Sequence, residues 1–507
     1  FRGGVTTFNN VGINLEKDNN TVFNIVGWKK IDLSELGRDY ATKIEGSVNI
    51  TANTINNTIY ALTVYNSAVN INNKGNLIFN GASNIGFSVL SWNPDKSKFI
   101  DLVAPNWRTV PNHEPTDKST FVPKIITSNP IQMYGDENVG IFFSAKKTDR
   151  TSTNSPSEAR DKKEGVGIHQ GIFDLKMEIG RYLNSDNTAA TQSTAGQLSK
   201  TGYTPTTVDG NVGVFVQSGQ REGVNIIGAT KGLSNGADFY DHRWANQTED
   251  IAYAKDPIHD LYMDKFKITF GKYAKNGFMF LVDNGSVVHL RDASNSGQDD
   301  FSDGIHGGAT DQAYTGTGTV VGYVNGLWKT ASTHLDTLPG HTTSLENMPS
   351  ELKVDQNLTM VSDKGIAYYA DNGGLVNVNN NKTTTAKGYG SIIGYAKGKD
   401  GTVKSTVNFT GNITAIDDIS NPLSDKITEK YTNIGVYAKD GGIVNVDGKA
   451  TIHGIGGFAD SGEVNMKNTD NEVTTVRDAG LVAKNGGKVN FNGGKIIIKN
   501  DSNVTKA

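Results

Sequence analysis

One segment of the chain spaces its side-chain oxygens like a calcium-binding loop. Positions 1, 3, 5, 9 and 12 of this segment are Asp292, Ser294, Ser296, Asp300 and Asp303, and a glycine stands at position 6. A Ca²⁺ loop of the EF-hand type uses this spacing. The match is partial, because an aspartate replaces the bidentate glutamate at the last position and no helical pattern flanks the segment. A Ca²⁺ site is therefore one hypothesis, and a solvated turn is the favoured alternative.

A second segment concentrates aromatic and charged residues inside a polar stretch. It contains Tyr240, Asp241, His242 and Trp244, and Trp92 and Trp107 lie in similar polar stretches. Aromatic faces beside carboxylates can bind a sugar, since the ring stacks on its C–H face while polar groups bind its hydroxyls. These six residues are the candidate ligand-binding residues. The favoured alternative is that the rings anchor the surrounding segments, because tryptophan is highly buried on average.

Catalytic motifs are missing from the sequence. It has no nucleophile elbow, no zinc-binding His-Glu-x-x-His, no Walker loop and no strand-linked dinucleotide fingerprint. It also has no cysteine, which excludes disulfides, thiolate zinc sites and a cysteine nucleophile. The better enzyme hypothesis is a β-helical polysaccharide lyase or hydrolase, in which paired carboxylates in the loops would act as acid and base. We do not expect the protein to be an enzyme.

A repeated phrase indicates the secondary-structure elements that must position the candidate ligand residues. It occurs at Gly365–Val378, Gly435–Val446 and Gly480–Phe491, with shorter relatives at 394 and 457. Each copy reads as a short apolar strand, an Asn-Gly or Gly-Gly turn, and a second strand in which apolar and polar residues alternate. This alternation has the period of two that is typical of strands. The steps between the glycines at 365, 394, 435, 456 and 480 are 29, 41, 21 and 24 residues, a range that is typical of solenoids.

A parallel β-helix fits these repeats better than a leucine-rich horseshoe or a propeller. Each repeat is then one coil, and its strands stack on those of the next coil about 4.8 Å away. The asparagines of the second strand share one face and should form a hydrogen-bonded column. They are Asn377, Asn445, Asn465 and Asn490. We interpret this column as structural and not as a binding site.

The chain divides into three predicted parts. Residues 1–90 form N-terminal coils, with a step of 21 residues from Asn49 to Asn70, and residues 361–507 form regular coils. Residues 91–360 form a decorated β-helix with a loop-rich head or side domain, because their long polar stretches far exceed ordinary connections. Strand phrases recur within them, which indicates that the coil continues beneath. They are Val139–Phe143, Val212–Val216, Gly277–Val282 and Val320–Val324.

Composition narrows the classes of partner. The 507 residues include 49 Lys and Arg against 53 Asp and Glu, a formal charge of −4. This balance offers no electrostatic footprint for nucleic acid or for an anionic membrane surface. The sequence contains no run of 18 apolar residues and no signal segment, and it begins with Phe1. We therefore expect a piece of a longer protein.

The repeated phrases, in a cysteine-free and asparagine-rich chain, resemble the passenger domain of the very large fusobacterial type V autotransporters. The resemblance is close over 361–507 and looser over 1–90. It implies a right-handed parallel β-helix that is displayed on the cell surface at the outer membrane and acts in virulence as an adhesin. Family members include a galactose-inhibitable and an arginine-inhibitable adhesin. The central residues match no family motif, and the C-terminal β-barrel that would provide the only membrane association is absent from the sequence.

Three functions follow as hypotheses. The leading one is an adhesin whose central region binds a host-cell glycan, a surface receptor or partner bacteria. The alternatives are a glycan-cleaving β-helix enzyme and a purely structural stalk. No cofactor is expected other than the hypothetical Ca²⁺.

Overall fold

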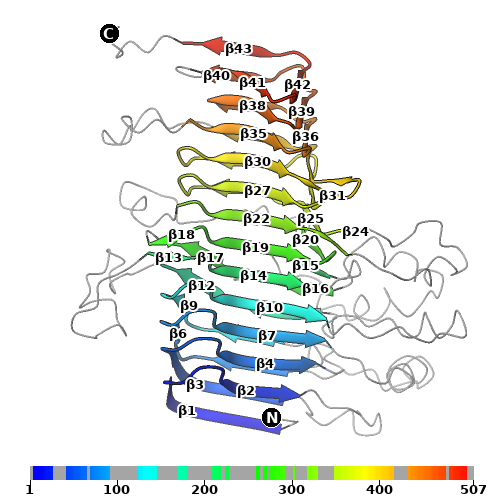
Figure 1. Cartoon of the computed structure of the whole chain (residues 1–507). Helices are drawn as coiled ribbons and strands as arrows, with labels where there is room; N and C mark the ends of the chain where they lie inside the picture. Colours follow the sequence, from blue (N-terminus) through cyan, green and yellow to red (C-terminus); the bar gives the residue numbers. More distant parts are fainter. Residues whose placement is uncertain are drawn as a thin grey trace, which may run out of the picture.

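The computed structural model describes fifteen parts of the chain. They are residues 4–26, 42–64, 69–91, 124–145, 170–180, 207–217, 223–227, 259–262, 267–271, 273–291, 301–302, 317–328, 348–415, 432–475 and 479–499. These parts contain strands and turns but no helix. The strands of successive coils lie one above the other along the length of the protein (Figure 1).

A 12-stranded sheet forms the front of the protein in Figure 1, and all its neighbouring strands are parallel. Every coil contributes one strand, in chain order. The strands are β2 (Thr21–Val26), β4 (Thr58–Val64), β7 (Ile85–Ser91), β10 (Val139–Ala145), β14 (Val212–Gln217), β19 (Phe278–Asp283), β22 (Val320–Asn325), β27 (Ile366–Asp371), β30 (Ile392–Lys397), β35 (Ile434–Lys439), β38 (Ile455–Asp460) and β41 (Leu481–Lys484).

An 18-stranded parallel sheet forms the next side, and it carries two strand columns in the N-terminal half. Its strands are β1 (Gly4–Leu15), β3 (Thr42–Ala52), β5 (Val69–Asn73), β6 (Leu77–Phe79), β8 (Lys124–Thr127), β9 (Ile131–Met133), β11 (Gln170–Asp174), β12 (Lys176–Ile179), β15 (Gly223–Ile227), β16 (His259–Tyr262), β17 (Lys267–Phe270), β20 (Val287–Arg291), β25 (Glu351–Val354), β28 (Leu375–Val378), β33 (Thr406–Phe409), β36 (Ile443–Val446), β39 (Glu463–Met466) and β42 (Lys488–Phe491). One coil contributes both β15 and β16, and β16 lies between β11 and β15.

A 7-stranded parallel sheet forms the third side of the C-terminal coils. It contains β21 (Phe301–Ser302), β26 (Leu358–Met360), β29 (Thr383–Ala386), β34 (Asn412–Ala415), β37 (Ala450–His453), β40 (Glu472–Thr475) and β43 (Lys495–Ile498). Three short pairs lie at corners: β13 (Val208–Asp209) with β18 (Ala274–Lys275), β23 (Leu327–Trp328) with β24 (Met348–Pro349), and β31 (Lys399–Asp400) with β32 (Val403–Lys404).

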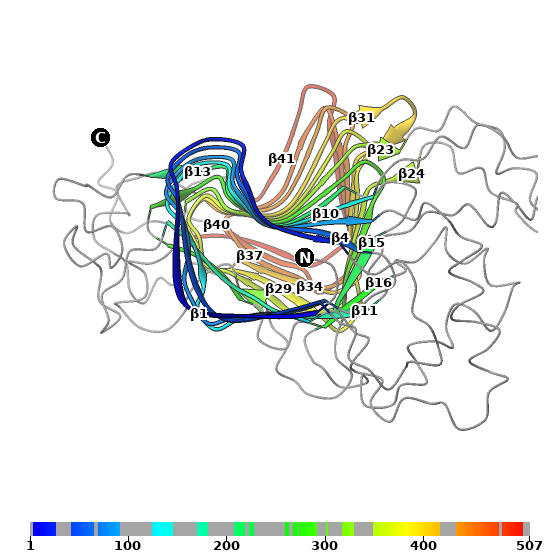
Figure 2. The same ribbon diagram turned by 90° about the horizontal axis from the view of Figure 1, so that it is seen from below.

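Each coil visits the three sides in a fixed order. In the C-terminal part the chain passes from β35 through β36 and β37 to β38, which pairs with β35. Viewed along the stack, the coils enclose a common interior (Figure 2). The fold is therefore all-β and a parallel β-helix, as the repeats predict.

The interior is one continuous apolar cluster that extends from Leu15 to Val473. Alternate residues of each strand face inward, so Val444 and Val446 are fully buried while Asn445 between them is not. Apolar surface removed from water in this way is the main force that holds the coils together. In the N-terminal coils, Phe23, Tyr60 and Phe87 stack at centroid distances of 4.9 and 4.8 Å.

The repeated Asp-Gly-Gly and Asn-Gly-Gly phrases form the corner between the first two sides. Asp440 and Gly441 have φ angles of 51° and 90°, the left-handed pair of a type I′ turn. Gly442 has a different role, because a Cβ there would lie 2.3 Å from the carbonyl oxygen of Ala396 in the preceding coil. The phrase thus combines a tight turn with a close approach of two backbones.

Two of the predicted repeat lengths are wrong. Ile366 pairs with Ile392 and Ile392 with Ile434, so these steps are 26 and 42 residues, not 29 and 41. The error arises because Gly365 and Gly394 do not occupy equivalent positions, whereas the glycines at 435, 456 and 480 do.

The predicted N-terminal step of 21 residues is also wrong. The long strand β3 belongs to both strand columns of the 18-stranded sheet. Asn49 lies in the second column and accepts a hydrogen bond from Asn76, 27 residues further along the chain. Asn70 instead pairs with Lys43 in the first column.

The central region contains coils, as its strand phrases predict. The strands β10, β14, β19 and β22 are consecutive members of the 12-stranded sheet. The long polar stretches on which the predicted head depends lie mostly outside the described residues, so the head stays a prediction.

Candidate functional site

All the residues singled out as candidate ligands lie outside the described part of the chain. These are Trp92, Trp107, Tyr240, Asp241, His242 and Trp244 for the ligand site, and Asp292, Ser294, Ser296, Asp300 and Asp303 for Ca²⁺. Both hypotheses therefore stay predictions. Among the described residues, the outward-facing side chains that could bind a ligand are concentrated instead in an asparagine column and in an aromatic stripe.

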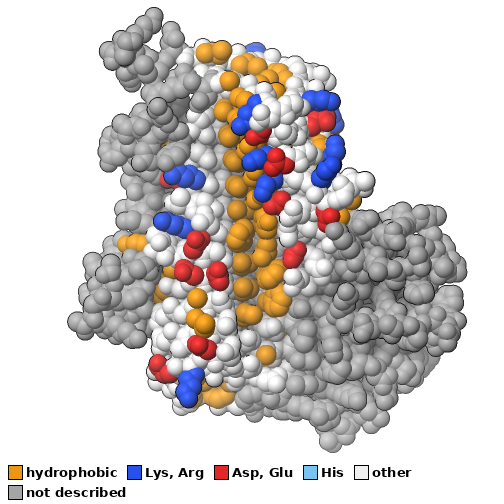
Figure 3. Space-filling model, viewed as in Figure 1, with side chains coloured by type: hydrophobic (Ala, Val, Ile, Leu, Met, Phe, Trp, Pro, Cys, Tyr) orange, Lys and Arg blue, Asp and Glu red, His pale blue; other side chains and the backbone are white. Residues whose placement is uncertain are grey.

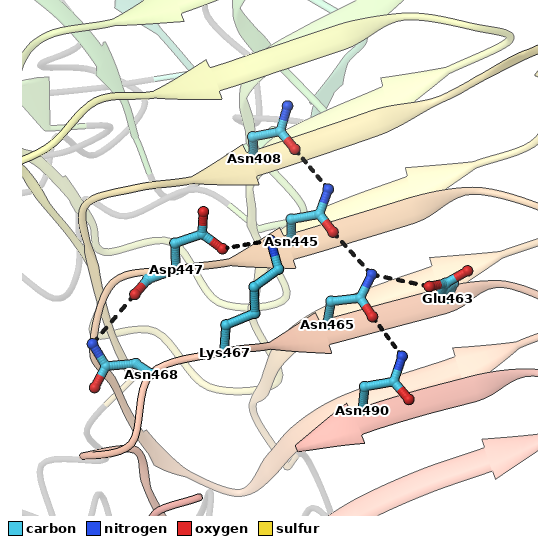
Figure 4. Close-up of polar contacts among 8 residues, drawn as sticks. All are labelled: Asn408, Asn445, Asp447, Glu463, Asn465, Lys467, Asn468 and Asn490. Atoms are coloured by element: carbon cyan, nitrogen blue, oxygen red, sulfur yellow. Dashed lines mark hydrogen bonds and ion pairs between the residues drawn. The ribbon is translucent and has the colours of Figure 1, made fainter. Parts of the chain in front are cut away.

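The asparagine column is confirmed, with one member that the sequence analysis missed. Each side-chain Nδ2 donates a hydrogen bond to the Oδ1 of the preceding coil (Figure 4). The donor–acceptor distances are 2.8 Å for Asn408 to Asn377, 2.8 Å for Asn445 to Asn408, 2.9 Å for Asn465 to Asn445 and 2.6 Å for Asn490 to Asn465. Asn408 was missed because a serine and a threonine, not two glycines, precede its strand core.

The amides of this column are already used within the protein. Asn377 donates to Glu351 at 2.8 Å, which closes the N-terminal end of the column. Beside Asn445 and Asn465 of the column, Lys467 forms an ion pair with Asp447 at 3.0 Å (Figure 4). Because both partners of that pair are about half exposed, it contributes little to stability. The column is thus structural, in agreement with the sequence-based interpretation.

A second asparagine column is fully buried, and the sequence analysis missed it. The Oδ1 atoms of Asn84, Asn138 and Asn211 accept backbone N–H bonds from Asn57, Asn84 and Asn138, respectively, at 2.8–2.9 Å. The signal was present as a repeated Asn-(Val or Ile)-Gly phrase at 84, 138, 211 and 433. The column links the central coils at 138 and 211 to the N-terminal coils, and Asn433 makes the same kind of bond with Ser391 in the C-terminal coils.

The aromatic stripe is a column of outward-facing apolar residues on the 12-stranded sheet. It consists of Phe142, Phe215, Leu281, Tyr323, Tyr369, Tyr395, Tyr437, Phe458 and Val482, which are register partners on nine consecutive strands from β10 to β41. All nine are partly exposed. In Figure 3 the hydrophobic side chains form a continuous vertical band on this face.

The local strand shape explains why these side chains gather. Ala367 and Tyr368 of β27 both face inward, so the strand bends between the outward-facing Ile366 and Tyr369. The bend forms an aliphatic column beside the stripe, whose members include Val320 and Ile455. Only 6% and 9% of these two residues are exposed.

The rings of the stripe stack along the rod. The Tyr369 and Tyr395 centroids are 4.5 Å apart at 20°, and those of Tyr395 and Tyr437 are 4.8 Å apart at 14°. Tyr323 and Phe458 turn edge-on at the two ends of this stack, at 70° and 64°. Offset-stacked and edge-to-face pairs are the favoured aromatic geometries, so the stack stabilises the outer face.

A polar border lines the other side of the stripe, at the ends of the strands. Its register partners are Asp283, Asn325, Asp371, Lys397 and Lys439, and Gln217 extends it in the preceding coil. Asp283 accepts hydrogen bonds from Gln217 and Asn325, both at 3.1 Å. In the upper coils Lys484 pairs with Asp460 at 3.1 Å and lies 5.3 Å from the Phe458 ring centroid.

The border and the stripe are electrically coupled. The hydroxyl of Tyr369 donates to Asp371 at 2.9 Å, and that of Tyr323 donates to the same oxygen at 3.4 Å. Burial, followed by the neighbouring Asp371 charge, raises the pKa of both tyrosines well above the ordinary value. Hydrogen bonding from Asn485 lowers the pKa of Asp460. These phenols therefore stay neutral donors at physiological pH.

In the part of the chain that the structure describes, no group of three or more histidine, aspartate or glutamate side chains could hold a metal ion. None of the described segments is a helix long and apolar enough to cross a membrane.

No protein-family model, curated protein or solved structure matches the chain.

Proposed function

We propose that the protein is an adhesin: a β-helical rod that presents the segments inserted between its strands to a host-cell glycan, a surface receptor or other bacteria. The observation that carries this proposal is a corner shared by several of the long insertions where they leave or rejoin the rod. We call it the insertion corner, and it lies between the ends of the 12-stranded sheet and the first column of the 18-stranded sheet.

The described strand ends define this corner. Ser91 and Ala145, where β7 and β10 end, are register partners, and so are Lys124 of β8 and Ile172 of β11. Segments 92–123 and 146–169 must therefore leave and rejoin the rod at neighbouring points. Segment 329–347 connects β23 to β24, and segment 228–258 leaves at the far end of β15 and rejoins the rod at this corner, where β16 begins. The pairs β23–β24 and β31–β32 lie at the same corner (Figure 2).

Long segments that emerge side by side from a rigid scaffold are a common way to build a binding surface. The repeated phrases in the C-terminal coils, which resemble fusobacterial autotransporter passengers, support display at the outer membrane. The aromatic and carboxylate residues in segments 92–123 and 228–258 supply the chemistry for a glycan.

The test replaces inserted segments and keeps every coil. Segments 92–123 and 228–258 are each exchanged for a short Gly-Ser linker, and the variant is compared with the parent for attachment to host cells, for binding to a glycan array and for thermal unfolding. Loss of attachment with an unchanged unfolding midpoint would support the proposal. The matched control exchanges segment 416–431, which joins β34 to β35 at a different corner.

The same samples test the two alternatives. New reducing ends after incubation with polysaccharide would indicate a glycan-cleaving enzyme. Failure of the parent protein to bind any cell or glycan would indicate a structural stalk. Attachment that survives both replacements would show that segments 92–123 and 228–258 do not carry the binding site.

A further inference from the structure

The aromatic stripe is an ordered apolar surface on the outside of the rod, and it runs across nine consecutive strands. Its nine strands, spaced about 4.8 Å apart, extend over about 38 Å, and strands of six residues give the face a width of about 20 Å. The face therefore measures about 800 Å², which is the area that one partner contributes to an interface of standard size. We propose that this face pairs with the same face of a second copy of the chain, with the two rods antiparallel. The pairing goes beyond the proposed adhesin function and does not depend on it.

The ring geometry favours a protein surface over a sugar as the occupant. A sugar stacks on an open ring face, but Tyr395 is covered on both faces by Tyr369 and Tyr437. The hydroxyls of Tyr323 and Tyr369 already donate to Asp371. The central rings thus offer edges, and ring edges pack well against the aliphatic and aromatic edges of a like surface.

The lateral order of the face selects the antiparallel arrangement. From one side to the other, a strand such as β27 presents the aliphatic column (Ile366), the stripe (Tyr369) and the polar border (Asp371). A two-fold axis parallel to the strands makes the second rod run in the opposite direction and sets the polar border of one copy against the polar border of the other. A two-fold axis parallel to the rods would set the border of one copy against the aliphatic column of the other. Only the first arrangement avoids burying charges against apolar residues.

The charges of the border agree with this arrangement. Its N-terminal half carries the carboxylates of Asp283 and Asp371, and its C-terminal half carries Lys397, Lys439 and Lys484 together with Asp460. In an antiparallel pair the acidic half of one copy therefore meets a mostly basic half of the other, in which Lys484 already pairs with Asp460. With the axis between β27 and β30, near the middle of the stripe, Asp371 of each copy faces Lys397 of the other.

Sedimentation velocity of the 507-residue chain over a wide concentration range tests the pairing. The wild-type protein should show a concentration-dependent dimer that weakens as salt is added. Tyr395→Glu, which buries a charge at the centre of the stripe, should leave only monomer. Lys397→Asp should weaken the dimer about ten-fold, since it breaks two symmetry-related ion pairs. Combining it with Asp371→Lys should restore the dimer, because the opposite charges again face each other.

Two comparisons separate pairing from folding. Lys449→Asp makes the same charge change at an exposed turn on another side of the rod and should leave the dimer unchanged. Thermal unfolding shows whether each variant keeps its fold, and a misfolded Tyr395 variant leaves the charge-swap series as the test. A wild-type protein that stays monomeric at every concentration would overturn the proposal. So would a monomer whose binding to a polysaccharide is lost on Tyr395→Glu, since the stripe would then be a sugar site.

Discussion

Removing one amide from the middle of the asparagine column should destabilise the coils on both sides of it. Asn445 donates to Asn408 at 2.8 Å and accepts from Asn465 at 2.9 Å. A hydrogen bond contributes about 0.5–1.5 kcal/mol net, and the neighbouring amides are only partly buried, so water can replace some of the loss. We expect Asn445→Ala to lower the free energy of unfolding by about 1–3 kcal/mol.

Asn445→Asp should cost at least as much at neutral pH, because a carboxylate oxygen would then face the Oδ1 of Asn408 without a proton between them. Acidification protonates the carboxylate and restores a donor, so part of the loss should be recovered. The matched control is Asn490→Ala, at the exposed end of the column, which removes only the hydrogen bond to Asn465 and should cost about 1 kcal/mol or less.

Urea unfolding followed by far-ultraviolet circular dichroism measures these differences as shifts of the midpoint at constant slope. Because stacked repeats can unfold in parts, hydrogen exchange of the β36 and β39 amides provides a local readout. An Asn445→Ala change of less than about 0.5 kcal/mol, or an equal cost at Asn445 and Asn490, would show that the column does not stabilise the stack.

Three further predictions concern the turns and the buried phenols. Gly442→Ala should lower the free energy of unfolding by about 3 kcal/mol in a thermal unfolding assay, since the added Cβ would overlap the Ala396 carbonyl oxygen. Gly12→Ala is the control, because a Cβ there meets nothing within 4 Å, and it should cost under about 1 kcal/mol. Tyr60→Phe should stabilise the protein by about 1 kcal/mol and raise its unfolding temperature, because the buried Tyr60 hydroxyl has no hydrogen-bond partner among the described residues. A lower unfolding temperature would show that this hydroxyl does make a stabilising hydrogen bond. Burial raises the pKa of Tyr60 and Tyr368, so their contribution to stability is complete below about pH 10 and is lost as the pH rises through the raised values. Spectrophotometric titration should show some of the 18 tyrosines ionising only as the fold is lost, and reversible ionisation of all of them near pH 10 would contradict the burial.

The fold could be predicted from the sequence because one phrase recurs with strand periodicity. The Val-Asn-Val pattern fixes which residues face inward, and the stacking of identical coils then follows. The alignment of one coil on the next was predicted less accurately where a glycine was used to mark equivalent positions. A glycine such as Gly394 is needed for close packing against Phe409, whereas Gly441 is needed for a left-handed turn, and the two roles occur at different positions of the coil.

The aromatic stripe was missed although its signal was present. Tyr369, Tyr395, Tyr437 and Phe458 each precede an alanine and then a charged residue, Asp or Lys. Their shared register becomes visible only when the strands are aligned on their inward-facing residues. The candidate ligand and Ca²⁺ residues are different, because the segments that contain them have no periodicity from which a position could be inferred.

A designed disulfide tests the stacked register most directly, since the chain has no cysteine of its own. Thr414 of β34 and Thr451 of β37 are partly exposed register partners, with backbones about 4.8 Å apart. That spacing lies within the range of about 4.4–6.8 Å that a disulfide spans. The pair Thr414 and Glu472 belongs to the same column but is two coils apart, at about 9.6 Å. After mild oxidation and mass spectrometry, cysteines at 414 and 451 should be linked and cysteines at 414 and 472 should stay free; the opposite result, or no link in either, would contradict the coil-on-coil register.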